Sequence, residues 1–461
     1  MRIEIKYMIA ILVITGYGIQ INAQGLFDVA GNNIDNSGNQ KVEINGYGRG
    51  SLYIGEKNGR AELSSGYLET ALRLKFLPDH SVALFSEARL RSGYEYGSSL
   101  FKPSLRELYA DIDIGKLDLR IGHQIIAWGR ADGINPTDNI TPRNYFVRSP
   151  EPDDIRLGNY LFRGRYQVNE NTRLEGIWVP FSRQSIYRFD LFEMPDYVRF
   201  RSGSNTVWES SGNLGLKLEF LFHGVDGSVS WFSGFDPQPG IGIDHLGIGM
   251  TDRLTIDLAA KAFRQNMIGT DFATVAGNFG IRGEAGLRIP EADYQDEIFT
   301  PATDIRYTLG IDRSIGNFNI MIQYFGQWVP SFKKMTEVIL FQQSGGIPLP
   351  EPLSYSHIPV IIGEQIKGFN RIIFGQTHRA SHTIALRPSV DLMFNTLKID
   401  LFAMYNISTE ELTILPRITY SVTDYWSISL GGQFLDGPDN SLNDMAGPLF
   451  NGGFLEVRRS F

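Results

Sequence analysis

The stretch Tyr67-Leu-Glu-Thr-Ala-Leu-Arg-Leu-Lys-Phe76 alternates between two kinds of side chain. One parity carries apolar residues such as Leu68 and Leu74, and the other carries Glu69 and Arg73. Successive residues of a β-strand point to opposite faces of the sheet. The stretch therefore predicts a strand with one face in hydrocarbon and the other in water.

The same alternation returns along the whole chain. It is found at residues 108–114, 160–168, 214–220, 256–262, 305–311, 318–324, 384–392 and 412–420. Short polar turns, such as 77–80 and 114–116, join some of these segments, whereas long segments join others. Short turns at one end and long loops at the other are typical of an outer-membrane β-barrel, whose short turns face the periplasm.

Counting strands under that constraint predicts an all-β protein, a transmembrane antiparallel β-barrel of about 18 strands (16–18). A barrel of that size leaves a lumen, because only barrels of about eight strands fill with their own side chains. Two segments, 241–249 and 371–374, could be extra strands within loops instead of barrel staves.

The domain organisation follows from the two ends of this pattern. Residues 1–23 have basic residues at Arg2 and Lys6, an apolar core and a small-residue end at Ala23, which predicts a secretory signal peptide. We expect residues 24–40 to be a short periplasmic segment. Residues 41–461 then form a single barrel with inserted loops at 131–154, 181–212 and 330–380, located in the bacterial outer membrane.

Composition excludes several other classes of protein. The chain has no cysteine, so it has no disulfide framework and no Cys-ligated metal. A formal charge of -8 argues against a general nucleic-acid binder, and a mean hydropathy of -0.15 argues against a protein of many membrane-spanning helices. The seven histidines show no metal-binding spacing and no nucleophile motif occurs. We therefore predict no enzyme, no metal and no cofactor.

The chain ends on an alternating segment, 454–461, whose last residue is Phe461. This end resembles the terminal strand signal that the outer-membrane barrel assembly machinery reads, in which a final Phe is the most specific element. The resemblance implies that this machinery is a partner of the chain.

Placing the apolar parity outward predicts which charged residues face the lumen. The candidate constriction residues are Arg89, Arg91, Glu107, Asp111, Arg120, Arg163, Arg165 and Arg173. Arginines and carboxylates are nearly balanced on this face, so two interpretations stay open. An arginine-lined wall would suit carboxylates or uronates, whereas a balanced wall would brace the barrel by cross-strand ion pairs. The best patch is the one formed by Arg163, Arg165 and Arg120.

Three stretches carry a family resemblance: LRELYAD at 105–111, LDLRIGHQIIAWGRAD at 117–132 and INPTD at 134–138. They resemble a family of outer-membrane porins known as a domain of unknown function. That family is commonly encoded beside RND-type exporters and is implicated in moving hydrophobic compounds. The chain is more distantly similar to alginate-export porins. His123 stands where the family usually has Arg, so the substrate is not carried over.

The resemblance also implies a fixed corner between a strand and a loop, folded into the barrel mouth. Its residues are His123, Gln124, Trp128, Gly129, Arg130, Asp132, Asn135, Pro136 and Asp138. Trp128 suits the interfacial aromatic girdle, and the Asn-Pro-Thr-Asp run makes tight turns that pin a loop. The corner either staples the loop to the wall or contacts a ligand.

The long loops contain apolar runs at 186–194, 197–200 and 338–341. Such loops either gather a hydrophobic substrate or pack on their neighbours and on lipopolysaccharide. Residues 335–343 could form a short amphipathic helix that folds into the lumen as a gate.

These features predict an outer-membrane, porin-like channel for a small or hydrophobic compound, gated by its long extracellular loops. The alternative is a structural or adhesive barrel whose loops bind a protein partner. Expected partners are outer-membrane lipid and lipopolysaccharide, the assembly machinery and an RND-type exporter or another envelope protein, but not nucleic acid.

Overall fold

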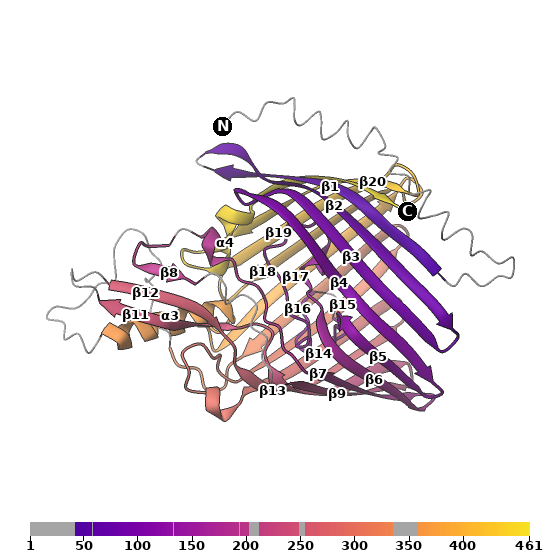
Figure 1. Ribbon diagram of the computed structural model, residues 1–461, viewed down its shortest axis with the longest axis horizontal. Helices are drawn as coiled ribbons and strands as arrows, with labels where there is room; N and C mark the ends of the chain where they lie inside the picture. The colour runs from indigo at the N-terminus through magenta and orange to yellow at the C-terminus, as the bar shows by residue number, and fades with distance from the viewer. Residues whose placement is uncertain are drawn as a thin grey trace.

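The computed structural model describes residues 42–57, 59–131, 133–192, 194–201, 212–248, 254–334 and 358–461. Within them, 18 strands form one antiparallel sheet. The sheet closes because β1 (Val42–Lys57) pairs with β2 (Arg60–Asp79) on one side and with β21 (Gly452–Ser460) on the other. The predicted fold class is confirmed, and its strand number lies at the upper end of the predicted range (Figure 1).

Each remaining barrel strand pairs with its neighbours in chain order. These strands are β3 (Val82–Glu95), β4 (Ser98–Ile114), β5 (Leu117–Gln124), β6 (Asn159–Asn169), β7 (Thr172–Val179), β9 (Asn213–Phe222), β10 (Val225–Phe235), β13 (Arg264–Ala276), β14 (Phe279–Pro290), β15 (Asp304–Ile315), β16 (Phe318–Trp328), β17 (Ala380–Leu392), β18 (Leu397–Asn406), β19 (Glu411–Ser421) and β20 (Trp426–Asp436).

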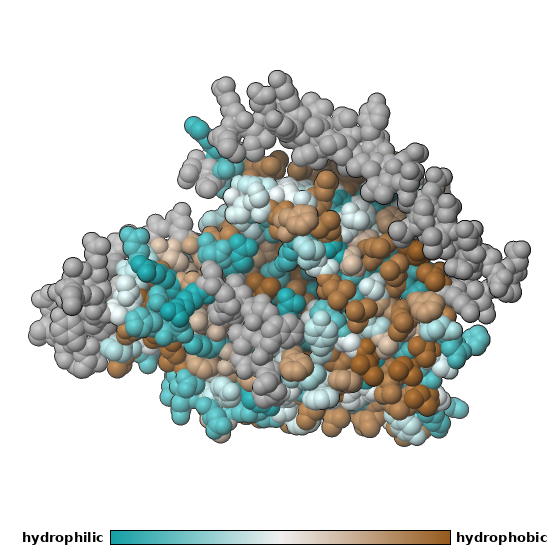
Figure 2. Space-filling view, viewed as in Figure 1, coloured by the Kyte–Doolittle hydropathy of each residue, from teal (hydrophilic) through white to brown (hydrophobic). Residues whose placement is uncertain are grey.

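The two faces of the wall differ as the alternation predicts. In β2, Leu68 is 41% exposed and its neighbour Glu69 is 3% exposed. Leu74 and Phe76 point outward in the same way, whereas Ala71 is fully buried. Figure 2 shows hydrophobic side chains gathered over the barrel strands. The outer face is therefore the lipid-facing surface of an outer-membrane protein.

The two ends of the barrel have different connections. Tight turns follow β2, β4, β6, β9, β13, β15, β17 and β19 at the periplasmic end. The longest connections, including 125–158 and 329–379, leave the extracellular end, as predicted. Among the described residues, no helix is long and apolar enough to span a membrane.

A small cap lies at the extracellular end, to the left in Figure 1. It contains a three-stranded sheet of β8 (Val198–Phe200), β11 (Gly240–Ile248) and β12 (Leu254–Lys261), together with α3 (Ile358–Ile373). The chain also forms short 3-10 turns at η2 (Phe189–Leu191), which contributes to the cap core, and at η3 (Ala292–Tyr294). The prediction that residues 256–262 form a barrel strand is wrong, because this stretch pairs within the cap. Alternation marks any half-buried strand, so it does not distinguish a cap from a wall.

The cap has its own apolar core. Phe189, Ile256, Ile366 and Phe369 are buried there, with partly buried Leu191 beside them. The apolar loop run at 186–194 therefore supplies packing within the cap, which favours the packing interpretation of these side chains. The run at 338–341 and the helix predicted at 335–343 lie outside the described residues.

The last residue closes the barrel seam. The amide of Phe461 donates to the carbonyl of Gly46 (3.1 Å), and the amide of Gly46 donates to the carbonyl of Phe461 (2.9 Å). A Cβ at Gly46 would meet the Phe461 ring at 2.9 Å, so the ring packs directly over this glycine. Recognition of Phe461 by the assembly machinery stays a prediction. The predicted signal peptide and periplasmic segment lie outside the described residues.

Candidate functional site

Between β5 and β6 the chain enters the barrel instead of forming an external loop. We call residues 125–158, of which 132 is not described, the inner segment. Gln124 is fully buried and donates to the carbonyl of Leu161 (3.1 Å), while the amide of Ile125 donates to Glu107 (2.9 Å). The chain therefore turns inward at the last residue of β5. His123 is buried beside this turn, with its ring 4.8 Å from the ring of Tyr160.

Trp128 holds the start of the inner segment against the wall. It is 2% exposed, and its indole N–H donates to the Glu175 carboxylate of β7 (2.7 Å). A Cβ at Gly215 in β9 would approach the same indole ring to 2.8 Å. The prediction that Trp128 belongs to the interfacial girdle is therefore wrong. The ring lies inside the barrel, where a carboxylate satisfies its N–H.

Glu284 of β14 anchors the next turn of the inner segment. Its Oε1 accepts from both the amide and the hydroxyl of Thr137, each at 2.7 Å. Its Oε2 accepts from the amides of Arg130 (3.2 Å) and Ala131 (3.3 Å). Gly129 precedes this turn with a φ of +95°, and a Cβ there would overlap the carboxylate. Glycine is needed here because the backbone must pass close to Glu284.

The remaining corner residues are held by charged and backbone contacts. Arg130 pairs with Asp226 (2.7 Å) and with Asp271 on the neighbouring wall strands. Asp138 pairs with Arg143 and Arg156 within the inner segment (2.7 and 2.6 Å). The backbone carbonyl of Asn135 accepts from the amide of Asp138, and the carbonyl of Pro136 accepts from the side-chain amide of Asn139. Asp132 lies outside the described residues. The structure brings these residues together as a folded unit.

The far end of the inner segment docks on the opposite wall. Asp154, in the short 3-10 turn η1 (Pro152–Ile155), accepts from Arg49 of β1 (2.6 Å) and Arg89 of β3 (2.7 Å). Ser149 bridges the pair, because its hydroxyl donates to Asp154 (2.5 Å) and accepts from Arg49 (3.1 Å). The inner segment therefore runs from β14 to β1 and β3, the strands on either side of β2. In the strand order of the closed barrel, β14 and β2 stand half a turn apart.

Two opposing effects act on the pKa of Asp154. Burial alone would raise it, but the Arg49 and Arg89 guanidinium groups outweigh burial and hold it well below the ordinary range. The carboxylate is therefore ionised at neutral pH and bound by charge-assisted hydrogen bonds.

Arg148 makes a second contact with this wall. Its guanidinium carbon lies 5.0 Å from the ring centroids of Tyr96 and Phe450 and 5.5 Å from that of Tyr53. It donates to the carbonyls of Leu449 and Phe450, at the end of α4 (Leu442–Phe450). The inner segment is thus joined to the connection between β20 and β21.

The predicted arginine patch lies elsewhere. Arg120, Arg163 and Arg165 line a cavity of about 490 Å³ on the inner wall, toward the periplasmic turns. Each is paired: Arg120 with Asp111 (2.6 Å), Arg163 with Glu175 (2.5 Å) and Arg165 with Asp118 (3.8 Å). Arg173 is not among the residues that line this cavity, and it pairs with Glu219 (3.9 Å). These pairs support the bracing interpretation of the balanced wall.

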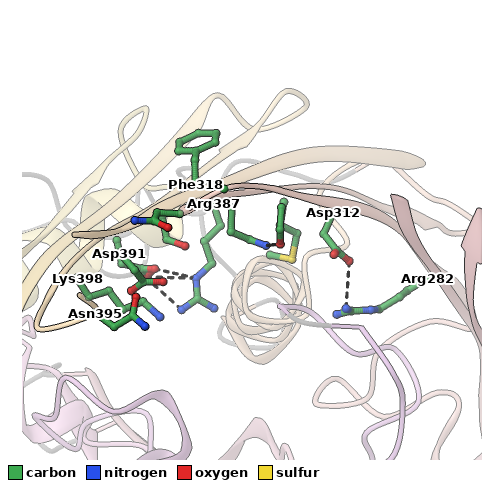
Figure 3. Close-up of a pocket in the computed structure, with 14 residues that line it drawn as sticks. Arg282, Asp312, Phe318, Arg387, Asp391, Asn395 and Lys398 are labelled. Atoms are coloured by element: carbon green, nitrogen blue, oxygen red, sulfur yellow. Dashed lines mark hydrogen bonds and ion pairs between the residues drawn. The ribbon is translucent and has the colours of Figure 1, made fainter. Parts of the chain in front are cut away.

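A second cavity of about 500 Å³ lies on the inner wall of β14 to β18 (Figure 3). Arg282 pairs with Asp312 on one side (3.1 Å), and Arg387 pairs with Asp400 on the other (3.1 Å). Lys398 lies near Arg387. Both cavities therefore combine arginines with carboxylates, as vestibules of mixed charge. Among the described residues, no group of three or more histidines or carboxylates is placed to hold a metal.

Of the predicted constriction residues, Arg89 and Arg91 join the wall that receives the inner segment. Arg91 pairs with Glu69 (2.7 Å). The sequence analysis did not identify Arg49 and Asp154 as the residues that join the inner segment to this wall. The parity of Arg49 with Tyr47 and Tyr53 in β1 could have indicated an inward position. Asp154 carried no such signal, because it lies in a loop without periodicity.

Comparison with solved structures shows the same fold. The structure is similar to Pseudomonas aeruginosa outer membrane protein opdK, with a TM-score of 0.54, 8% identity and coverage of 91% of this chain and 98% of the other. It is also similar to Acinetobacter baumannii OccAB4 (TM-score 0.51, 9% identity, 93% and 100% covered) and to P. aeruginosa OccK3 (0.52, 9%, 95% and 99%). No curated protein sequence matches the chain.

A family model described as "Protein of unknown function (DUF1302)" matches residues 4–294, more than half of the chain. That range includes the inner segment, Gly129 and Glu284. The chain, an outer-membrane β-barrel, is therefore a member of the DUF1302 family.

Proposed function

We propose that this protein is a porin-like outer-membrane channel for a small or hydrophobic compound, whose bore is narrowed by the inner segment. One observation carries the proposal. The inner segment crosses the interior of a closed barrel, bound to Glu284 of β14 at one side and to Arg49 and Arg89 at the other. A chain held across a lumen leaves narrow passages beside it, and such passages select solutes by size and charge.

The lining of the lumen favours a small polar solute. Cross-strand ion pairs such as Arg73–Glu87 (2.8 Å) and Arg288–Asp304 (2.6 Å) face inward. An apolar compound would gain little by contact with these charges, whereas a small charged or hydrogen-bonding solute would replace water at them. Passage of a hydrophobic compound stays the second form of the proposal and rests on the family resemblance.

The extracellular cap is the proposed outer gate. The side-chain amide nitrogen of Gln376, just after α3, donates to Asp304 of β15 (3.0 Å) and to the carbonyl of Ala302 (2.8 Å). Arg306 donates to the carbonyl of Phe374 (2.9 Å). The cap is thereby hydrogen-bonded to the barrel rim, so its movement would change access to the lumen. The inserted loops 181–212 and 330–380 contribute to this cap.

We keep the expected partners as proposals. Lipopolysaccharide and lipid would contact the outward apolar face, and the assembly machinery would read the strand that ends at Phe461. An RND-type exporter, or a role like that of alginate-export porins, would need contacts at the periplasmic turns. Co-purification of the full chain from native membranes tests each partner separately.

The experiment that tests the channel is a single-channel recording of the refolded full chain in a planar bilayer. We expect a small, stable conductance that increases when Glu284 is replaced by alanine. A barrel that is silent both as the native chain and after this substitution would contradict the proposal.

The alternative is an adhesive or structural barrel, and the folded cap with its own apolar core is the observation that favours it. A stoichiometric protein partner that is lost when the cap is removed would support this alternative.

A further inference from the structure

Without Asp154, the wall that receives this residue would carry one more positive charge than negative charges. Among the described residues, ion pairs within 4.0 Å connect five guanidinium groups with four carboxylates of the wall. The guanidinium groups belong to Arg49, Arg73, Arg89, Arg91 and Arg106, and the wall carboxylates to Glu69, Glu87, Glu95 and Glu456. Asp154, from the inner segment, is the fifth carboxylate and makes the network neutral.

A further positive charge lies beside this network. The guanidinium carbon of Arg458 is 4.2 Å from the centroid of the Tyr47 ring, which itself donates to Glu69 (2.8 Å). Removing the inner segment would therefore leave a positively charged wall that faces the lumen. A wall of one charge sign inside a narrow lumen attracts counter-ions, so another anion would take the place of Asp154.

The site of Asp154 has the geometry of a carboxylate receptor. One carboxylate oxygen accepts from Arg49 and the other from Arg89, with Arg106 at 4.0 Å, and the side chain is 6% exposed. The Nε of Arg49 is buried and has no hydrogen-bond partner among the described residues. Two charge-assisted hydrogen bonds from arginines, one to each oxygen, bind a carboxylate strongly.

The segment that carries Asp154 is held mainly by polar contacts. Its turn η1 contains no buried residue, and the N-cap residue Glu151 makes no side-chain capping hydrogen bond. The neighbouring Asp153 side chain is 84% exposed. A dissolved carboxylate could therefore replace the contacts of Asp154 without opening an apolar core.

We propose that Asp154 is a tethered counter-ion occupying an anion subsite formed by Arg49, Arg89 and Arg106, and that a carboxylate-bearing solute displaces it and releases residues 149–156 from the wall. The inference rests on the proposed channel function, because the solute must enter the lumen. It names the class of solute and the contact that the solute breaks.

A spin label tests the displacement without any need for conduction. The chain has no cysteine, so Asp153→Cys in the refolded full chain gives a single labelling site on an exposed side chain. We expect the label to show the restricted motion of an ordered backbone in this parent protein. Added succinate and the further substitution Asp154→Asn should each mobilise it. Uncharged succinamide should leave the motion of the label unchanged. The matched control Glu151→Gln should also leave it unchanged, because the Glu151 carboxylate lies outside the network, 3.7 Å from Arg417.

Several results would overturn the inference. Identical spectra for the parent and Asp154→Asn would exclude a tether, and equal effects of succinate and succinamide would exclude a charged subsite. An equal response to inorganic phosphate would exclude a preference for carboxylates. If Asp154→Asn lowers the folded fraction, Arg89→Gln alters the subsite from the wall side. It removes one of the two arginines that hold Asp154, so it should partly mobilise the label without succinate and reduce the further effect of succinate; a label as restricted as in the parent would overturn the inference.

Ion selectivity provides an independent measurement. Loss of one negative charge beside the lumen should raise the anion-to-cation permeability ratio several-fold, because the same charge attracts cations and repels anions. Adding Arg89→Gln to Asp154→Asn restores the charge balance and should return the ratio toward the native value. An unchanged ratio in Asp154→Asn would contradict the inference. A barrel without conductance would count against the channel function. The spin-label measurement would then decide by itself whether the anion subsite exists.

Discussion

Glu284 is the contact on which docking of the inner segment at β14 depends, so its replacement should release that part of the segment. Glu284→Ala removes the acceptor of four hydrogen bonds, two at 2.7 Å and two at 3.2 and 3.3 Å. Hydrogen bonds to a charged group contribute about 1.5–3 kcal/mol each, and longer ones contribute less. We therefore expect a loss of about 4–6 kcal/mol in the free energy of docking, a factor of about 10³ to 10⁴ in the docked population.

Hydrogen exchange of the Thr137 amide measures this loss directly. Thr137 is 1% exposed and its amide donates to Glu284, so exchange in the native protein requires local release. We expect exchange to accelerate by up to the same factor and single-channel conductance to rise. Glu284→Gln should have about half the effect on the free energy. Its amide oxygen can still accept from Thr137, while its amide nitrogen faces the donors of Arg130 and Ala131.

The control is Asp312→Asn, which removes an inward carboxylate from β15. Asp312 pairs with Arg282 (3.1 Å), and none of its described contacts is with the inner segment. In the Asp312→Asn variant, the Thr137 amide should exchange at the same rate as in the native chain. The reasoning would be refuted if Glu284→Ala left both the Thr137 exchange rate and the conductance unchanged in a folded barrel.

Three further predictions follow from single positions. Gly129→Ala should accelerate exchange across 128–137, because the residue has a φ of +95° and its new Cβ would overlap Glu284; unchanged exchange would contradict this. Gly46→Val should reduce the yield of heat-resistant folded barrel on gels, because a side chain there would collide with the carbonyl of Ala71 and the Phe461 ring at the seam; a normal yield would contradict it. The pKa of Asp154 is lowered in the folded protein, so its contribution to docking is present above the ordinary pKa of about 3.9 and is lost as the pH falls through the lower folded value. The mobility of a label at position 153 should therefore be constant from pH 8 to about pH 4, and release near pH 6 would contradict the assignment.

Much of the barrel could be predicted from local sequence, because each strand carries its own signal. A residue such as Leu68 faces lipid and Glu69 faces the lumen whatever the neighbouring strands are, since alternation is a property of a single strand. The asymmetry of the turns then predicts the orientation of the barrel. The same local signal misplaced residues 256–262, because a strand of the cap is also half buried.

The candidate site could be predicted only in part. The family resemblance drew attention to the corner that contains Trp128 and Gly129, but it gave no partner for either residue. Trp128 was assigned to the lipid interface on its residue type alone. In the structure Glu175 accepts from its indole, a contact between residues 47 positions apart in the chain.

By itself, the sequence determined the wall, its two faces and its two ends, since these depend on the period of two within each strand. Only the tertiary structure decided which charges meet. Asp154 lies 105 residues from Arg49 and 65 from Arg89, and the pairing arises because the inner segment crosses the closed barrel. No periodicity records such a contact, because the position of a loop in a lumen depends on the complementary charge of walls that exist only after the barrel has closed.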